Sequence, residues 1–100
     1  MPKWGFLTNH ALVLIHVFEH PRSTLREIAQ TVGITERAAL SILRQMEGED
    51  CVHRTREGRR NHYTVNLPAI MAMQTQLPYN LYQIVRAIAR LFEEARPTKG

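Results

Sequence analysis

The sequence predicts a mainly α-helical fold with one small β-hairpin, and three observations support this prediction. Two amphipathic helices, at about 24–32 and 36–48, are separated by only three residues. Across residues 52–65 the spacing of apolar residues changes from that of a helix to the alternation, with a period of two residues, that is typical of a strand. A broad amphipathic helix follows at about 81–95. This order predicts a winged helix-turn-helix followed by a C-terminal dimerisation helix.

The composition is that of a small globular domain. Of the 100 residues, 44% are hydrophobic and 22% are charged, which excludes a disordered tail and a large enzyme scaffold. We expect a single domain over 1–100, with a winged helix-turn-helix core at 7–66 and a C-terminal helical segment at 67–96. The apolar run from Ala11 to Phe18 is far shorter than the ~20 residues of a membrane span, so no membrane partner is expected.

The charge balance favours a polyanionic partner. The net charge is +4 and the isoelectric point is about 9.8. Most of the basic residues are arginines, whose planar fork suits phosphate and guanine, so nucleic acid is the leading partner. Cys51 is the single cysteine, which excludes an intrachain disulfide and a cysteine zinc cage and fits a cytoplasmic location.

The first helix is expected over 9–19. Thr8 or Asn9 can cap its start, and Pro21 ends it because the residue before a proline disfavours helical geometry. Its apolar surface extends well round the cylinder, so the helix is either central in the monomer or packed against another chain. One apolar stripe at helical spacing comprises Ala11, Leu14, Ile15 and Phe18, and the apolar surface is extended by Leu12, Val13 and Val17.

The next two helices have clear boundaries. Thr24 and Glu27 have the spacing of a capping box at the start of the helix at 24–32, and Gly33 stands where a left-handed residue ends it. Thr35 can cap the helix at 36–48, and a glycine in so short a joint is typical of a helix-turn-helix. The expected core residues are Leu25, Ile28, Ala29 and Val32, then Ala39, Ile42, Leu43 and Met46.

With that apolar stripe inward, the helix at 36–48 presents polar side chains outward. In a major groove arginine can bind guanine, glutamine can pair with adenine, and Leu40 can contact a thymine methyl group. A solvated face is the alternative for any single helix taken alone. The candidate DNA-binding residues of this helix and its cap are Thr35, Arg37, Ser41, Arg44 and Gln45.

Residues 52–56 and 59–65 are expected to form two strands joined at Glu57 and Gly58. Arginines crowd the turn, which predicts a basic wing that lies along the DNA backbone or enters the minor groove. The alternative for Arg60 is an internal ion pair with Glu27 or Glu36. Val52, Tyr63 and Val65 are expected to cover the core, and the candidate wing and phosphate contacts are Thr24, Arg54, Arg56, Arg59 and Arg60.

The C-terminal segment is expected to be helical. Pro68 can start a short helix to about Gln76, and Asn80 with Gln83 has the spacing of another capping box before the helix at 81–95. A terminal amphipathic helix added to a complete winged unit most simply buries its apolar face against a twofold mate. The candidate dimer interface is Leu81, Ile84, Val85, Ile88, Leu91 and Phe92.

This order of elements resembles the small winged helix-turn-helix transcriptional regulators of prokaryotes, of the MarR and ArsR type. Four stretches look like one MarR-like subgroup, namely residues 7–11, 24–29, 32–37 and 57–63. The resemblance covers residues 7–66 and is only architectural beyond Pro68. It implies a homodimeric, DNA-binding regulator of transcription that acts as a repressor. It implies no particular ligand, so any small-molecule effector is unidentified.

One departure from the family lies between the helix at 36–48 and the wing. Such regulators usually carry a glycine followed by an apolar residue, where this chain has Asp50 and Cys51. Asp tolerates left-handed geometry better than most residues, so the turn is expected to survive. The side chains of Glu47, Glu49 and Asp50 must point away from DNA, or they lower its affinity for this surface.

Other reactive residues have plainer interpretations. His16 and His20 have the spacing of two metal ligands on one helix face, but no cysteine accompanies them, so we expect structural histidines and no metal site. Cys51 can be a redox sensor, but a small buried hydrophobe is the favoured interpretation. The sequence contains no phosphate loop, catalytic triad or carboxylate pair, so we expect neither an enzyme nor a cofactor.

The resulting hypothesis is a sequence-specific regulator that binds double-stranded DNA as a homodimer on a near-palindromic site. Its half-sites are expected about one helical turn apart, roughly 34 to 36 Å. Two alternatives stay open. One is a winged-helix adaptor that contacts proteins, and the other is an RNA-binding protein that reads shape.

Overall fold

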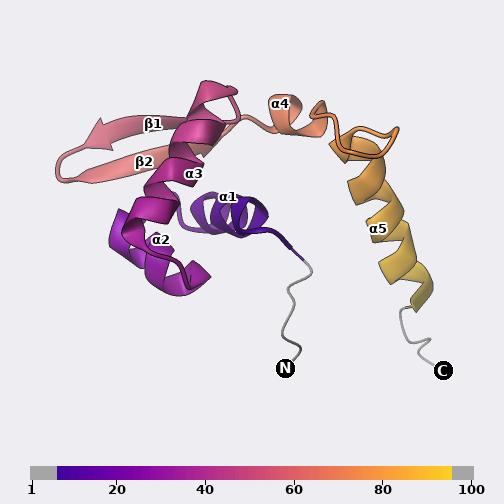
Figure 1. Cartoon of the computed structure of the whole chain (residues 1–100), viewed down its shortest axis with the longest axis horizontal. Coiled ribbons are helices and arrows are strands. Elements are labelled where there is room, and N and C mark those ends of the chain that lie inside the picture. The colour runs from indigo at the N-terminus through magenta and orange to yellow at the C-terminus, as the bar shows by residue number, and fades with distance from the viewer. Residues whose placement is uncertain (1–6, 96–100) are drawn as a thin grey trace. The chain divides into compact units, whose positions relative to one another are not determined.

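The computed structural model describes residues 7–95, which divide into two compact units on either side of the bond between Asn66 and Leu67. The first unit contains α1 (Asn9–Glu19), α2 (Leu25–Val32), α3 (Glu36–Gly48) and a hairpin of β1 (Val52–Glu57) and β2 (Arg60–Val65) (Figure 1). The second unit contains α4 (Leu67–Met71) and α5 (Leu81–Ala95). The predicted mainly α-helical class with one β-hairpin is confirmed.

Each helix of the first unit begins at a threonine cap. Oγ1 of Thr8 and of Thr35 each accepts a hydrogen bond from the backbone N–H three residues further on. Thr24 and Glu27 form the predicted capping box, in which the Glu27 N–H donates to Thr24 Oγ1 at 3.1 Å and the Thr24 N–H donates to Glu27 Oε1 at 2.7 Å. Gly33 ends α2 in the left-handed conformation, with φ of 85°.

The core of the first unit lies where α1, α2, α3 and the hairpin meet. The expected apolar face of α3 is buried in full, as is Tyr63 of β2. The Tyr63 N–H donates to the carbonyl oxygen of Pro21 at 2.8 Å, which attaches the hairpin to the loop between α1 and α2. The largest fully buried side chains are Val13, Val17, Ile28, Leu43 and Val52.

Of the apolar side chains of α1, those of Val13 and Val17 face the core. Ile15 and Phe18 expose 47% and 66% of their surface, whereas Val13 and Val17 are completely buried. Because α1 carries apolar residues round most of its circumference, spacing alone does not select the face that packs inward.

Asp50 occupies the left-handed position that ends α3, with φ of 64°. The Cys51 N–H donates to the Met46 carbonyl oxygen at 2.9 Å and the Asp50 N–H donates to that of Glu47 at 3.0 Å, the two bonds of a Schellman motif. The side-chain amide of Asn66 donates to the Asp50 carbonyl oxygen at 2.9 Å. The turn into the wing therefore forms without a glycine, as expected from the tolerance of Asp for this geometry.

The hairpin pairs β1 and β2 in antiparallel register, with Glu57 opposite Arg60 at its end. Its two turn residues are Gly58 and Arg59, one position later than predicted. Gly58 has φ of 60°, which the first turn residue of a type II′ hairpin requires. Arg59 therefore stands at the tip of the wing.

In the second unit, α4 is shorter than predicted and ends at Met71 instead of near Gln76. Thr75 Oγ1 accepts a hydrogen bond from the Leu77 N–H at 3.2 Å and donates one to the Tyr79 carbonyl oxygen at 2.7 Å. These side-chain bonds replace helical ones and hold the segment as a loop.

The capping box predicted before α5 is present. The Asn80 N–H donates to Gln83 Oε1 at 2.8 Å, and the Gln83 N–H donates to Asn80 Oδ1 at 2.9 Å. No residue of α5 is buried. None of the helices within residues 7–95 is both long and apolar enough to span a membrane.

Candidate nucleic-acid interface

The outward face of α3 forms a shallow groove lined by five residues, namely Arg37, Leu40, Ser41, Arg44 and Gln45. The direction of this face follows from the burial of the opposite face of α3 in the core. The side chains of Arg37, Ser41 and Arg44 are exposed, and none makes a hydrogen bond or ion pair within residues 7–95. Their donors are therefore available to a ligand outside the chain.

Gln45 differs from its neighbours in the groove because its carboxamide has a partner inside the chain. Nε2 of His10, in the first turn of α1, lies 2.6 Å from Oε1 of Gln45. Since a carboxamide oxygen only accepts hydrogen bonds, Nε2 of His10 carries the hydrogen. Sequence reasoning missed His10, because the two residues are 35 positions apart and no local pattern connects them.

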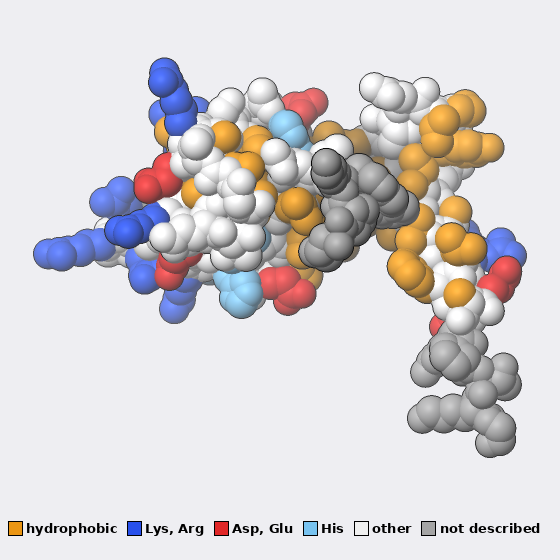
Figure 2. All heavy atoms as spheres, turned by 60° about the horizontal axis from the view of Figure 1, so that its bottom comes forward, with side chains coloured by type: hydrophobic (Ala, Val, Ile, Leu, Met, Phe, Trp, Pro, Cys, Tyr) orange, Lys and Arg blue, Asp and Glu red, His pale blue; other side chains and the backbone are white. Residues whose placement is uncertain are grey.

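The four arginines of the wing differ in their partners. Arg59 is exposed and makes no hydrogen bond or ion pair with any described residue. Arg56 donates through Nε to the Gly58 carbonyl oxygen at 3.0 Å, so its side chain stays on the wing. Arg54 pairs with Glu47 at 3.4 Å. Figure 2 shows Lys and Arg side chains gathered at the hairpin end of the first unit.

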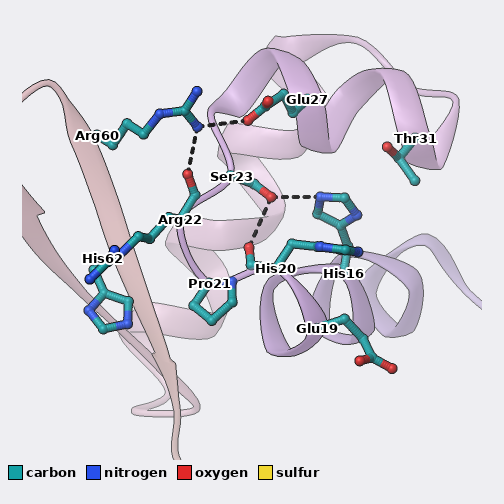
Figure 3. Close-up of a pocket in the computed structure, with 10 residues that line it drawn as sticks. All are labelled: His16, Glu19, His20, Pro21, Arg22, Ser23, Glu27, Thr31, Arg60 and His62. Atoms are coloured by element: carbon teal, nitrogen blue, oxygen red, sulfur yellow. Dashed lines mark hydrogen bonds and ion pairs between the residues drawn. The ribbon is translucent and has the colours of Figure 1, made fainter.

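Arg60 forms part of the base of the wing. Its NH1 group donates to Glu27 Oε1 at 3.0 Å and to the Arg22 carbonyl oxygen at 2.8 Å (Figure 3). Of the two acids that the sequence offered as internal partners, Glu27 is the one in contact. The Arg22 side chain pairs in turn with Glu57 of β1 at 3.1 Å. These contacts attach the wing to the segment that starts α2.

Glu27 is stabilised as a carboxylate by these neighbours. The Thr24 N–H has the largest effect, followed by the Arg60 guanidinium, and together they hold the pKa of Glu27 below its ordinary value. Thr24 and Thr35, both candidate phosphate contacts, use Oγ1 to accept the capping hydrogen bonds. Their positions at helix N-termini are those at which backbone N–H groups favour an anion.

Two of the three acidic residues between α3 and the wing face side chains of β1. Glu47 is half-buried and pairs with Arg54, and Asp50 pairs with His53 at 3.0 Å. Glu49 is exposed. The Arg54 guanidinium therefore partly offsets the charge of Glu47, which reduces its repulsion of a polyanion.

His16 and His20 lie in a hollow formed by the end of α1, the start of α2 and β2 (Figure 3). Oγ of the buried Ser23 donates to the His20 carbonyl oxygen at 2.9 Å and is 2.9 Å from Nε2 of His16, which therefore donates to it. Burial lowers the pKa of His16, the nearby His20 lowers it further, and Glu27 opposes them. Within residues 7–95 no three His, Cys, Asp or Glu side chains are grouped to hold a metal ion.

Cys51 lies at the end of the turn and is 2% exposed. Burial raises the pKa of its thiol, and Glu49 and Asp50 raise it further. The thiol form is therefore favoured over the reactive thiolate, which supports the interpretation of Cys51 as a small buried hydrophobe.

The apolar face of α5 is only partly covered within its own unit. Val85, Leu91 and Phe92 expose 43%, 64% and 71% of their surface, and the other three candidate interface residues are half-buried (Leu81, Ile84 and Ile88). Figure 2 shows hydrophobic side chains along this helix. An exposed apolar stripe of this kind is typical of an interaction surface, and its role in a dimer stays a prediction.

No family model and no curated protein sequence matches the chain. Among solved structures, MepR, a transcription regulator of the Staphylococcus aureus multidrug efflux pump MepA, matches with a TM-score of 0.58 at 18% identity over 88% of this chain. A mutant of S. aureus MepR matches with a TM-score of 0.59 at 17% identity over 90% of this chain. S. aureus MepR bound to ethidium bromide matches with a TM-score of 0.58 at 17% identity over 95% of this chain. The chain spans 58%, 61% and 63% of these three proteins. The likeness confirms the winged-helix fold.

Proposed function

We propose that this chain is a transcription regulator and not an enzyme, and that it binds double-stranded DNA sequence-specifically as a homodimer and represses transcription. The observation that carries the proposal is the groove along α3, in which the exposed donors of Arg37, Ser41 and Arg44 have no partner within residues 7–95. The fold shared with MepR, a transcription regulator, supports the proposal.

In this proposal α3 enters the major groove and the wing follows the adjacent backbone. Arg37 and Arg44 bind guanine edges, and Ser41 contacts a neighbouring base. Arg56 and Arg59 reach phosphate or the minor groove from the wing tip. The remaining phosphate contacts are Thr24, Thr35, Arg54 and Arg60. Arg54 and Arg60 contact phosphate through the guanidinium nitrogens that do not take part in their ion pairs with Glu47 and Glu27.

The homodimer forms through the apolar face of α5. A second copy of the chain carries the same face, so a twofold axis buries both surfaces at once. The same axis presents two copies of α3 to a palindromic site, with half-sites about one helical turn apart. The structure of MepR with ethidium bromide supports control of such a regulator by a small-molecule effector.

The test is selection from a pool of random duplex DNA by the purified full chain at two salt concentrations, followed by sequencing. The proposal predicts an enriched near-palindrome and binding that weakens steeply with salt, because phosphate contacts release counterions. Salt-sensitive binding without an enriched sequence would replace it with an architectural or RNA-directed role. No binding would favour the protein-contacting adaptor.

A further inference from the structure

We infer that His10 determines which bases Gln45 reads, because it holds the Gln45 carboxamide so that only the NH2 group faces the DNA. This inference rests on the proposed function. His10 lies in the first turn of α1, whose start is fixed by the Thr8 cap. Gln45 lies in the groove of α3, and the 2.6 Å contact between Nε2 of His10 and Oε1 of Gln45 joins the two helices at the protein surface.

The surroundings of this contact assign it to recognition and not to folding. Both side chains are exposed, and an exposed hydrogen bond adds little net stability because water replaces it readily. The other polar residues of the groove, Arg37, Ser41 and Arg44, make no such bond within residues 7–95. Gln45 is therefore the one base-facing side chain of the described groove whose orientation is set by a second residue.

The consequence is a change in the hydrogen-bonding pattern that Gln45 presents. A bidentate contact with adenine needs both carboxamide atoms on the base edge, the NH2 for N7 and the oxygen for the N6 amino group. His10 turns the oxygen toward α1, so the NH2 alone remains for DNA. A lone donor suits N7 of either purine, O6 of guanine and O4 of thymine, and it opposes the N4 amino group of cytosine. It lacks the acceptor that pairs with the N6 amino group of adenine, so it no longer distinguishes adenine from guanine. In place of the pairing with adenine predicted from sequence, Gln45 is thus expected to accept either purine or thymine without favouring adenine, and to disfavour cytosine.

Binding-site selection with four forms of the full chain tests this inference, namely the wild type, His10→Ala, His10→Gln and Gln45→Ala. Gln45→Ala identifies the base position under residue 45 as the one that loses its preference. At that position the wild type is expected to accept guanine, adenine or thymine without favouring adenine, and to disfavour cytosine. His10→Ala is expected to raise adenine there about five-fold or more, the range that one good base contact supplies, with all other positions unchanged. His10→Gln keeps a donor at similar reach and is expected to retain the wild-type preference.

The outcomes separate this inference from the proposed function. A wild-type preference for adenine at this position, an unchanged preference in His10→Ala, or no position affected by Gln45→Ala would each overturn the role of His10 while the enriched palindrome stood. A purely structural role would lower all affinities equally and leave the base preference unmoved, which also overturns it. Failure of the wild type to enrich any sequence would remove the proposed function, and the role of His10 with it.

Discussion

Arg60 in the wing and Glu27 at the start of α2 are joined by an ion pair of 3.0 Å. The same Glu27 carboxylate accepts the Thr24 N–H and closes the capping box, so a single side chain both starts α2 and attaches the wing. The base of the wing that carries Arg59 is therefore attached in part by an acid that lies outside the wing.

Glu27→Gln is expected to lower stability at neutral pH and to weaken the response of the chain to acid. Because the Thr24 N–H and then Arg60 lower the pKa of Glu27, its contribution is present above the ordinary carboxyl pKa of 4.5 and is lost as the pH falls through the lowered value. Urea unfolding between about pH 7 and pH 3 measures this. The free energies of unfolding of the two proteins are expected to converge at acid pH.

Glu36→Gln is the matched control, because Glu36 occupies the first turn of α3 without an arginine partner among the described residues. It is expected to change the pH profile less than Glu27→Gln does. A difference between wild type and Glu27→Gln that stays constant with pH would contradict the assignment.

Arg44→Ala is expected to cost about 1 to 3 kcal/mol on the selected DNA site and to relax the preference at one base position, with little effect on random DNA. The reason is that its guanidinium lines the groove and has no partner within residues 7–95. Fluorescence anisotropy with the two duplexes measures it, and Arg86→Ala, which removes one exposed charge from α5, is the control. An equal loss on both duplexes would make Arg44 a phosphate contact only.

Arg59→Ala is expected to weaken binding to all DNA sequences by a similar factor and to reduce the slope of log affinity against log salt by about 1, as for one lost phosphate contact. Arg59 stands at the wing tip and has no described partner. Titrations over a range of salt concentrations measure the slope. An unchanged slope would exclude a phosphate contact by Arg59.

Leu91→Glu is expected to convert a dimer into a monomer, because it places a charge in the exposed apolar face of α5. Sedimentation of the full chain at several concentrations measures the change. Leu77→Glu is the control, since Leu77 is similarly exposed, at 58%, but lies in the loop before α5. A Leu91→Glu protein that remained dimeric would move the interface away from this face.

Asp50→Ala is expected to destabilise the chain by about 1 to 2 kcal/mol, because alanine is strained at the left-handed φ of 64°. Asp50→Gly is expected to cost less, since glycine adopts this geometry without strain and loses only the side-chain contacts. Urea unfolding of both variants measures the order. A glycine variant less stable than the alanine variant would show that the Asp50 side chain matters more than its backbone geometry.

The sequence predicted the helix boundaries and caps of the first unit well, because these depend on local chemistry. The capping box of Thr24 and Glu27, the cap at Thr35 and the left-handed Gly33 all follow from side chains within a few residues of each other. The bounds of α5 followed from the same kind of pattern. Local rules therefore predict where elements begin and end.

The features that could not be predicted from local sequence patterns are the buried face of α1, the end of α4 and the internal partners in the candidate interface. The buried face of α1 is set by what packs against it, and an all-round apolar helix contains no signal for that choice. The end of α4 depends on the bonds of Thr75 across its loop. In the candidate interface, the partners of Arg60 and Gln45 lie 33 and 35 residues away. The tertiary structure is therefore needed to select Glu27 from the two acids expected for Arg60 and to identify His10, which no local pattern indicates.

The central claim is that α3 gives sequence-specific binding to duplex DNA. The most direct measurement is the ratio of the dissociation constants of the full chain for its best-selected duplex and for a scrambled duplex of equal length and composition, at one fixed salt concentration. We expect a preference of about 10³-fold or more for the selected duplex, as specific protein–DNA complexes show. A ratio near one would contradict it, because the basic groove and wing would then bind DNA by charge alone.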